Sequence, residues 1–139
     1  MAQGEFTAEE RAALKERATE SRAARSGKKG YDEADLLAKI AEMVDEDREI
    51  AEAVHGAVTA AAPDLTPTLW YGMPAYAKDG KVVCFFQPAQ KFKARYSTLG
   101  FNDPARLDDG AMWPTAFAVT AVTPQVRTRI AALLRQAVS

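Results

Sequence analysis

The only histidine of the chain is His55, and nucleophilic catalysis by serine or cysteine usually needs a histidine base. Glu52 precedes it by three positions, and side chains at this spacing on a helix can share a ligand. Two ligands are too few for a firm transition-metal site. The simpler interpretation is a solvated histidine near a carboxylate, about 120° away from the apolar stripe of its helix.

Acidic residues gather on the same predicted helix. Asp45, Glu49 and Glu52 fall within about 60° of one another, opposite the apolar stripe. Grouped carboxylates can hold hard cations weakly, iron and calcium above all. Together with His55 these residues form a candidate metal site, and the alternative is an ordinary solvated surface.

The segment from Leu69 to Tyr76 is rich in aromatic residues. Trp70, Tyr71 and Tyr76 bring large rings with polar tips, and the glycine and proline between them shape the chain. These rings either belong to the core or form the lip of a ligand pocket. In the second case we expect the pocket to include residues from later in the chain, namely Lys93, Arg95, Tyr96 and Trp113.

A basic, aromatic surface is also typical of RNA-binding proteins. However, Lys91, Lys93 and Arg95 form only a small cluster, and the sequence pI is 5.9, so we expect no nucleic-acid partner. The sequence has no glycine-rich phosphate loop, no nucleophile elbow and no pair of histidines at metal-ligand spacing. An enzyme is therefore the least favoured functional class.

The elements that must position these residues begin with an N-terminal arm. A capping box at Thr7–Glu10 starts a helix that runs to about Arg25, and Leu14 is its only large apolar residue. Because this helix has little to bury, we expect an appended arm and linker over residues 1–30 and a domain over 31–139. Two further helices follow, from Asp32 and from Asp45, with a break near Val44.

Later in the chain the pattern changes to strands. A hairpin over 75–78 and 81–87 surrounds Asp79-Gly80, and strands are predicted over 93–98 and 115–121. Thr123 and Pro124 then open a last helix. This order predicts the α+β class, with an antiparallel sheet of about four or more strands, helices packed on one face, and the appended N-terminal helix.

The charge distribution, the single cysteine and the hydropathy of the chain indicate the cellular compartment. The net charge is +2 over residues 1–31, −8 over 32–64 and +5 over 65–139. The lone Cys84 lies in an apolar run that predicts a buried strand and an inert thiol. No apolar run is long enough to span a membrane, and the first residues do not resemble a signal peptide. We expect a cytoplasmic protein with no membrane partner.

Three stretches of the chain resemble a known family. The sequence Tyr71-Gly72-Met73-Pro74-Ala75-Tyr76, the Asp79–Val83 hairpin and Lys93 are similar to the YdhG-like domains, also called the domain of unknown function 1801 family. The resemblance covers about residues 32–138 and implies a small bacterial α+β domain likened to frataxin, with the label of iron chaperone. It implies iron delivery with an acidic helical face as the ion-binding surface. Many members carry a histidine after the lysine, whereas this chain has Ala94.

Two functional hypotheses follow. In the first, the chain is an iron-binding chaperone that uses the acidic face, requires no resident cofactor, binds iron weakly and passes it to an accepting protein. In the second, it is a non-metal binding module that takes a protein or a small molecule on the aromatic surface around Trp70 and Tyr76.

Overall fold

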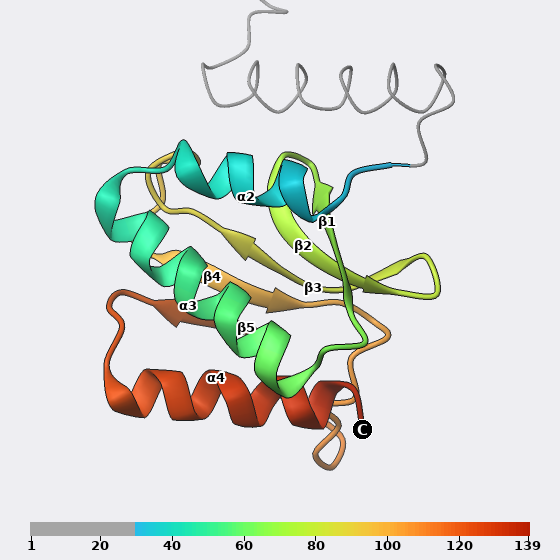
Figure 1. Cartoon of the computed structure of the whole chain (residues 1–139). Helices are drawn as coiled ribbons and strands as arrows, with labels where there is room; N and C mark the ends of the chain where they lie inside the picture. Colours follow the sequence, from blue (N-terminus) through green and yellow to red (C-terminus); the bar gives the residue numbers. More distant parts are fainter. Residues whose placement is uncertain (1–29) are drawn as a thin grey trace, which may run out of the picture.

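The structure, a computed structural model, describes residues 30–139 and places three helices and five strands within them. In chain order these are α2 (Glu33–Ala41), α3 (Asp45–Ala61), β1 (Thr66–Trp70), β2 (Met73–Lys78), β3 (Lys81–Gln87), β4 (Ser97–Phe101), β5 (Ala116–Val119) and α4 (Pro124–Ala137). The strands form one antiparallel sheet in the order β1-β2-β3-β4-β5, and the helices cover one of its faces (Figure 1). The expected α+β architecture is confirmed. The helix predicted between Thr7 and Arg25 lies outside the described residues.

Local signals set the helix boundaries. Asp32 caps α2, because its carboxylate accepts the N–H of Asp35 at 3.0 Å while the Asp35 carboxylate accepts the N–H of Asp32 at 2.9 Å. The predicted break near Val44 is confirmed, with Val44 as the residue before α3. Thr123 caps α4 through the N–H of Val126 at 3.1 Å. No helix within residues 30–139 is long and apolar enough to cross a bilayer.

Two tight turns join the first three strands. Their central residues all have positive φ, which is 51° and 76° at Tyr71 and Gly72 and 52° and 79° at Asp79 and Gly80. Such turns match the twist of a hairpin. The predicted β2–β3 hairpin is therefore confirmed. Strand β1 was not predicted, because Pro67 and a turn that begins with tyrosine hide its signal.

The strand predicted over residues 93–98 is wrong at its start. Residues 88–96 form an irregular loop, and β4 begins only at Ser97. Lys93 has a φ of 51°, a conformation that does not continue a strand. The strand predicted over 115–121 contains β5, which is shorter at both ends.

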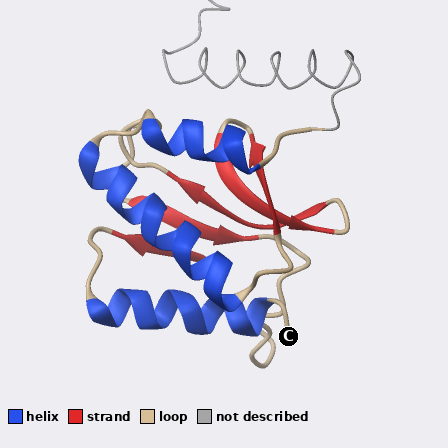
Figure 2. Ribbon diagram, viewed as in Figure 1, coloured by secondary structure: helices blue, strands red, loops and turns tan. Residues whose placement is uncertain are grey.

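The two faces of the sheet differ. Helices α2, α3 and α4 cover one face of the sheet (Figure 2). Tyr76 points to this face, because its hydroxyl contacts His55 on α3. Tyr76, Cys84 and Phe86 are at most 1% exposed and belong to the core. The expected burial of Cys84 in a strand is confirmed, and β3 is the central strand. Trp70 and Phe85 lie on the face that these helices leave open, with ring centroids 5.1 Å apart.

Candidate functional site

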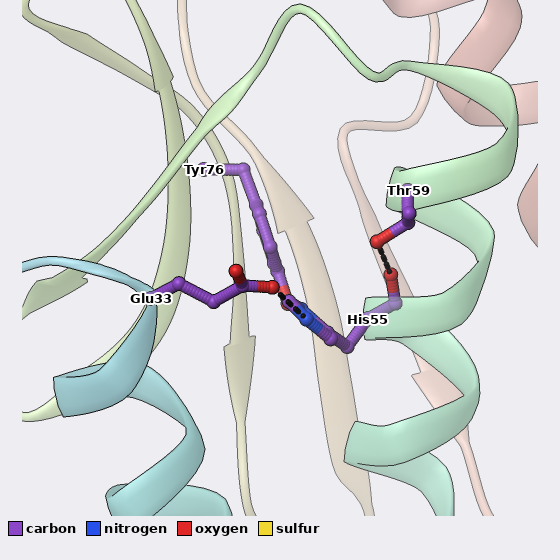
Figure 3. Close-up of polar contacts among 4 residues, drawn as sticks. All are labelled: Glu33, His55, Thr59 and Tyr76. Atoms are coloured by element: carbon purple, nitrogen blue, oxygen red, sulfur yellow. Dashed lines mark hydrogen bonds and ion pairs between the residues drawn. The ribbon is translucent and has the colours of Figure 1, made fainter.

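A chain of hydrogen bonds joins His55 to two other elements (Figure 3). Its Nδ1 lies 2.9 Å from the hydroxyl of Tyr76 on β2, and its Nε2 lies 2.9 Å from Oε2 of Glu33 on α2. Burial raises the pKa of the Tyr76 phenol well above its ordinary value, so the hydroxyl stays protonated and can donate. The Glu33 carboxylate can only accept, so the ring proton of neutral His55 is assigned to Nε2, and Nδ1 accepts from the Tyr76 hydroxyl.

This geometry gives His55 partners other than the expected one. The helical position predicts Glu52 as its neighbour, whereas both ring nitrogens contact groups on α2 and β2. The side chain is 16% exposed, so it is half-buried rather than solvated. Sequence reasoning missed Glu33 because it lies 22 positions away, on another helix. No periodic signal within one helix identifies such a partner.

The acidic face lies on the solvent side of α3. Asp45 forms an ion pair with Arg48, with Oδ1 and Nη2 2.6 Å apart, and Glu49 and Glu52 are exposed. The structure does not bring His55 to these three carboxylates. Across residues 30–139, no three His, Cys, Asp or Glu side chains are grouped as a metal ion would need.

Asp47 is a buried carboxylate that the sequence interpretation missed. It is 6% exposed and accepts the N–H of Gln90 at 2.9 Å and the hydroxyl of Ser97 at 3.3 Å. The Ser97 hydroxyl in turn accepts the N–H of Ala89 at 3.0 Å. A signal was present, because Asp47 precedes the buried Ile50 by three positions and so shares its helix face. These bonds fix the loop 88–96 to the first turn of α3.

A hollow of about 350 Å³ opens beside this carboxylate. The loop 88–96 contributes Arg95 and Tyr96, with the Arg95 guanidinium 5.2 Å from the centre of the Tyr96 ring. The other residues that line the hollow come from the region around the start of α3, from the loop, from the start of β4 and from the end of β5. They are Val44, Glu46, Asp47, Ile50, Ala89, Gln90, Ala94, Ser97, Val119 and Thr120. Two of the predicted ligand-binding residues therefore share one hollow.

A second hollow, of about 270 Å³, lies on the other side of Asp47. Asp47 and Gln90 line both hollows, and Lys39 and Lys91 face only the second. The ammonium of Lys91 donates to the carbonyl of Gly72 at 3.4 Å, which connects the loop to the β1–β2 turn. The hydrogen bond between Asp47 and Gln90 thus lies between two concave surfaces.

The remaining predicted ligand-binding residues do not converge. Trp70 contacts Tyr71 on the open face of the sheet, with ring centroids 4.9 Å apart. Tyr76 points to the opposite face and contacts His55. Trp113 packs against the core from the loop before β5, and Lys93 lies in the loop 88–96 without lining its hollow. The aromatic surface predicted as one site is therefore divided among separate places.

No protein-family model matches this chain, and no curated protein or solved structure matches it either.

Proposed function

We propose that this chain is a non-metal binding module, and that it takes a small zwitterionic molecule in the hollow between α3 and the loop 88–96. The observation that carries this proposal is the buried Asp47 carboxylate, which holds the wall of the hollow in place through Gln90 and Ser97. A pre-formed wall lowers the entropic cost of binding. The volume of about 350 Å³ suits a molecule of the size of an amino acid or a dipeptide.

The chemistry of the lining defines the ligand class. The guanidinium of Arg95 presents paired N–H donors that match a carboxylate. The Glu46 carboxylate on the α3 side can accept from an ammonium group. Ile50 and Val119 supply apolar surface to the same hollow. This is a binding function without a chemical step, and we place it in a reducing cytoplasm, which suits the free thiol of Cys84.

Titration of isotope-labelled protein with free amino acids and dipeptides tests this proposal by NMR. We expect saturable shifts confined to residues 44–50, 89–97 and 119–120, with dissociation constants in the millimolar range or tighter. Arg95→Gln should weaken binding by about tenfold or more, because one charge-assisted contact is lost. Arg127→Gln removes the same charge from α4, outside the hollow, and should leave binding unchanged. Equal effects of the two variants, or no saturable shift, would overturn the proposal.

Iron handling is the second candidate, as the resemblance to the YdhG-like domains implies. The exposed carboxylates of Glu49 and Glu52 on α3 and the charge of −8 over residues 32–64 support it. Iron would be cargo held weakly at this face. A ferrous titration of the parent at low salt should saturate, and the triple variant Asp45→Asn, Glu49→Gln, Glu52→Gln should not bind. Absence of saturable binding in the parent would exclude this candidate.

A further inference from the structure

Strand β5 forms one edge of the five-stranded sheet, and no other strand within residues 30–139 pairs with its outer side. The N–H of Phe101 donates to the carbonyl of Thr115 at 2.8 Å, next to the β4–β5 register. Polar backbone groups alternate in direction along an antiparallel strand. Those of Phe117 therefore point to β4, and those of Ala116 and Ala118 point outward.

This edge carries none of the usual protection against further pairing. Exposed edge strands are commonly blocked by charges, prolines or bulges. The opposite edge, β1, contains Pro67. In contrast, β5 contains neither a proline nor a charged side chain, and Ala116 and Ala118 are small and exposed. An incoming strand would therefore meet only the small side chains of Ala116 and Ala118 at the outward positions of β5.

An apolar groove of about 430 Å³ runs beside the edge, between β5 and α4. Phe117 and Val119 line it from the sheet, and Ile130 and Leu133 line it from the helix. Alternate side chains of a strand point to the same face. A segment paired with β5 would therefore place every second side chain toward this groove.

The charge around the groove between β5 and α4 distinguishes a second copy of this chain from other possible occupants. Residues 110–139 contain no acidic side chain, whereas α4 carries the exposed Arg127, Arg129 and Arg135. The Arg129 guanidinium lies 5.5 Å from the centre of the Phe117 ring and lines the groove. A second copy paired through its own β5 would bring a second helix with the same arginines. Like charges then oppose that dimer and favour an acidic occupant.

We propose that β5 and this groove form a docking site for an extended, acidic segment of a partner protein, which adds to the sheet as a sixth strand. The backbone of Ala116 and Ala118 supplies the hydrogen bonds, as in other strand-addition complexes. Apolar side chains of the segment enter the groove, and its carboxylates lie near Arg129. This interaction is separate from the hollow at Arg95 and does not depend on its ligand.

Synthetic peptides test the proposal with the full chain. The probe is an eight-residue peptide of alternating valine and threonine with glutamates added at both ends. One matched peptide has lysines in place of the glutamates, and another has proline at its centre. By fluorescence anisotropy we expect the glutamate peptide to bind at least about tenfold tighter than the lysine peptide, with affinity falling as salt rises. The proline peptide should not bind.

Variants then locate the site. Ala118→Pro removes an outward N–H and should abolish binding, while circular dichroism checks that the chain remains folded. Arg129→Glu keeps the backbone of the edge intact and should reverse the preference to the lysine peptide. Lys81→Glu makes the same charge change at the start of β3 and should leave the preference unaltered. The proposal is overturned if the two charged peptides bind equally, or if Arg129→Glu and Lys81→Glu behave alike. It is also overturned if sedimentation shows a dimer that Ala118→Pro dissociates, since the edge then serves a second copy.

Discussion

Gly100 on β4 lies beneath the ring of Phe85, its partner on β3. A Cβ atom at this position would lie 2.6 Å from Cε1 of that ring and closer still to Cζ. The residue type is thus required by the close approach of an aromatic ring, in the manner of a glycine covered by its cross-strand neighbour.

We therefore expect Gly100→Ala to displace the ring and to lower the free energy of unfolding by about 1–3 kcal/mol. Gly56→Ala is the matched control, because it lies within α3 with no atom within 4 Å of the added Cβ. That change should raise stability by up to about 1 kcal/mol through helix propensity. Urea unfolding of both variants measures the difference, and a neutral Gly100→Ala would contradict the packing described.

The contribution of the Asp47 hydrogen bonds to stability can be tested in the same way. Asp47→Ala leaves the N–H of Gln90 and the hydroxyl of Ser97 without their shared acceptor. A buried hydroxyl that loses its partner costs about 1–3 kcal/mol, and the part-buried N–H of Gln90 adds to this, so a clear loss of stability is expected. Glu49→Ala, at an exposed position on the same helix, should stay within about 0.5 kcal/mol of the parent. Similar urea midpoints for the two variants would show that the Asp47 bonds contribute little.

Single residues were predictable where their environment follows from neighbours in sequence. Cys84 lies in an unbroken apolar run, and its burial was predicted correctly. His55 and Asp47 depend on partners 22 and 43 positions away, in Glu33 and Gln90. Helical periodicity indicates which side of a helix a residue occupies, but it does not identify the element packed there.

Elements were predictable where a capping or turn signal marks them. The Asp79-Gly80 hairpin and the Thr123 cap of α4 have such signals, the acidic first turn of α3 marks the α2–α3 break, and all three are confirmed. Strand β1 and the loop 88–96 lack them. The conformation of the loop 88–96 depends on hydrogen bonds to Asp47, which lies on α3, more than 40 positions earlier. The local preferences of the loop residues do not predict these bonds.

The bonds of His55 tie α2, α3 and β2 together, and Tyr76→Phe tests that connection. The variant keeps the ring but removes the donor to Nδ1, so we expect a loss of about 1 kcal/mol in urea unfolding. NMR of the imidazole nitrogens should also show a smaller population of the tautomer protonated at Nε2. Thr59→Ala removes a hydroxyl that donates to the His55 carbonyl on the exposed side of α3, and it should leave the tautomer unchanged. An unchanged tautomer in Tyr76→Phe would show that the Glu33 carboxylate alone holds the proton on Nε2 and that the Tyr76 hydroxyl does not contribute.

Within residues 30–139, the part of the chain that the structure describes, the buried core is built from residues 36–137. We therefore expect a chain that lacks residues 1–28 to unfold cooperatively, with a thermal midpoint within about 8 °C of the full chain, a shift that corresponds to roughly 1–2 kcal/mol. Differential scanning calorimetry of the two chains tests this. Loss of the cooperative transition would show that the N-terminal residues complete the core.

Two buried groups at the centre of the sheet, the Tyr76 phenol and the Cys84 thiol, make the free energy of unfolding depend on pH in the alkaline range. Tyr76 and Cys84 are paired residues on β2 and β3 and are both fully buried. Burial raises the pKa of the Cys84 thiol from 9.0 to about 12, and burial also raises the pKa of Tyr76 above its ordinary value of 10.0. Both groups thus keep their protons in the folded chain and release them on unfolding. These two groups leave the free energy of unfolding unchanged below pH 9. It falls above pH 9 as Cys84 ionises in the unfolded chain, and above pH 10 as Tyr76 does as well, by roughly 1–2 kcal/mol per pH unit for each group.

Between pH 9 and 10 the decrease should come mainly from Cys84, because the unfolded tyrosine ionises only above this window. Cys84→Ala removes that thiol, and its baseline at pH 7 records the packing cost of the substitution. Urea midpoints measured at intervals from pH 7 to 10 should decrease in the parent above pH 9 and stay nearly level in the variant. Lysines and all other titratable groups are the same in both chains, so they cannot produce this difference. If both chains decline in parallel, Cys84 is not the group that couples alkaline pH to unfolding.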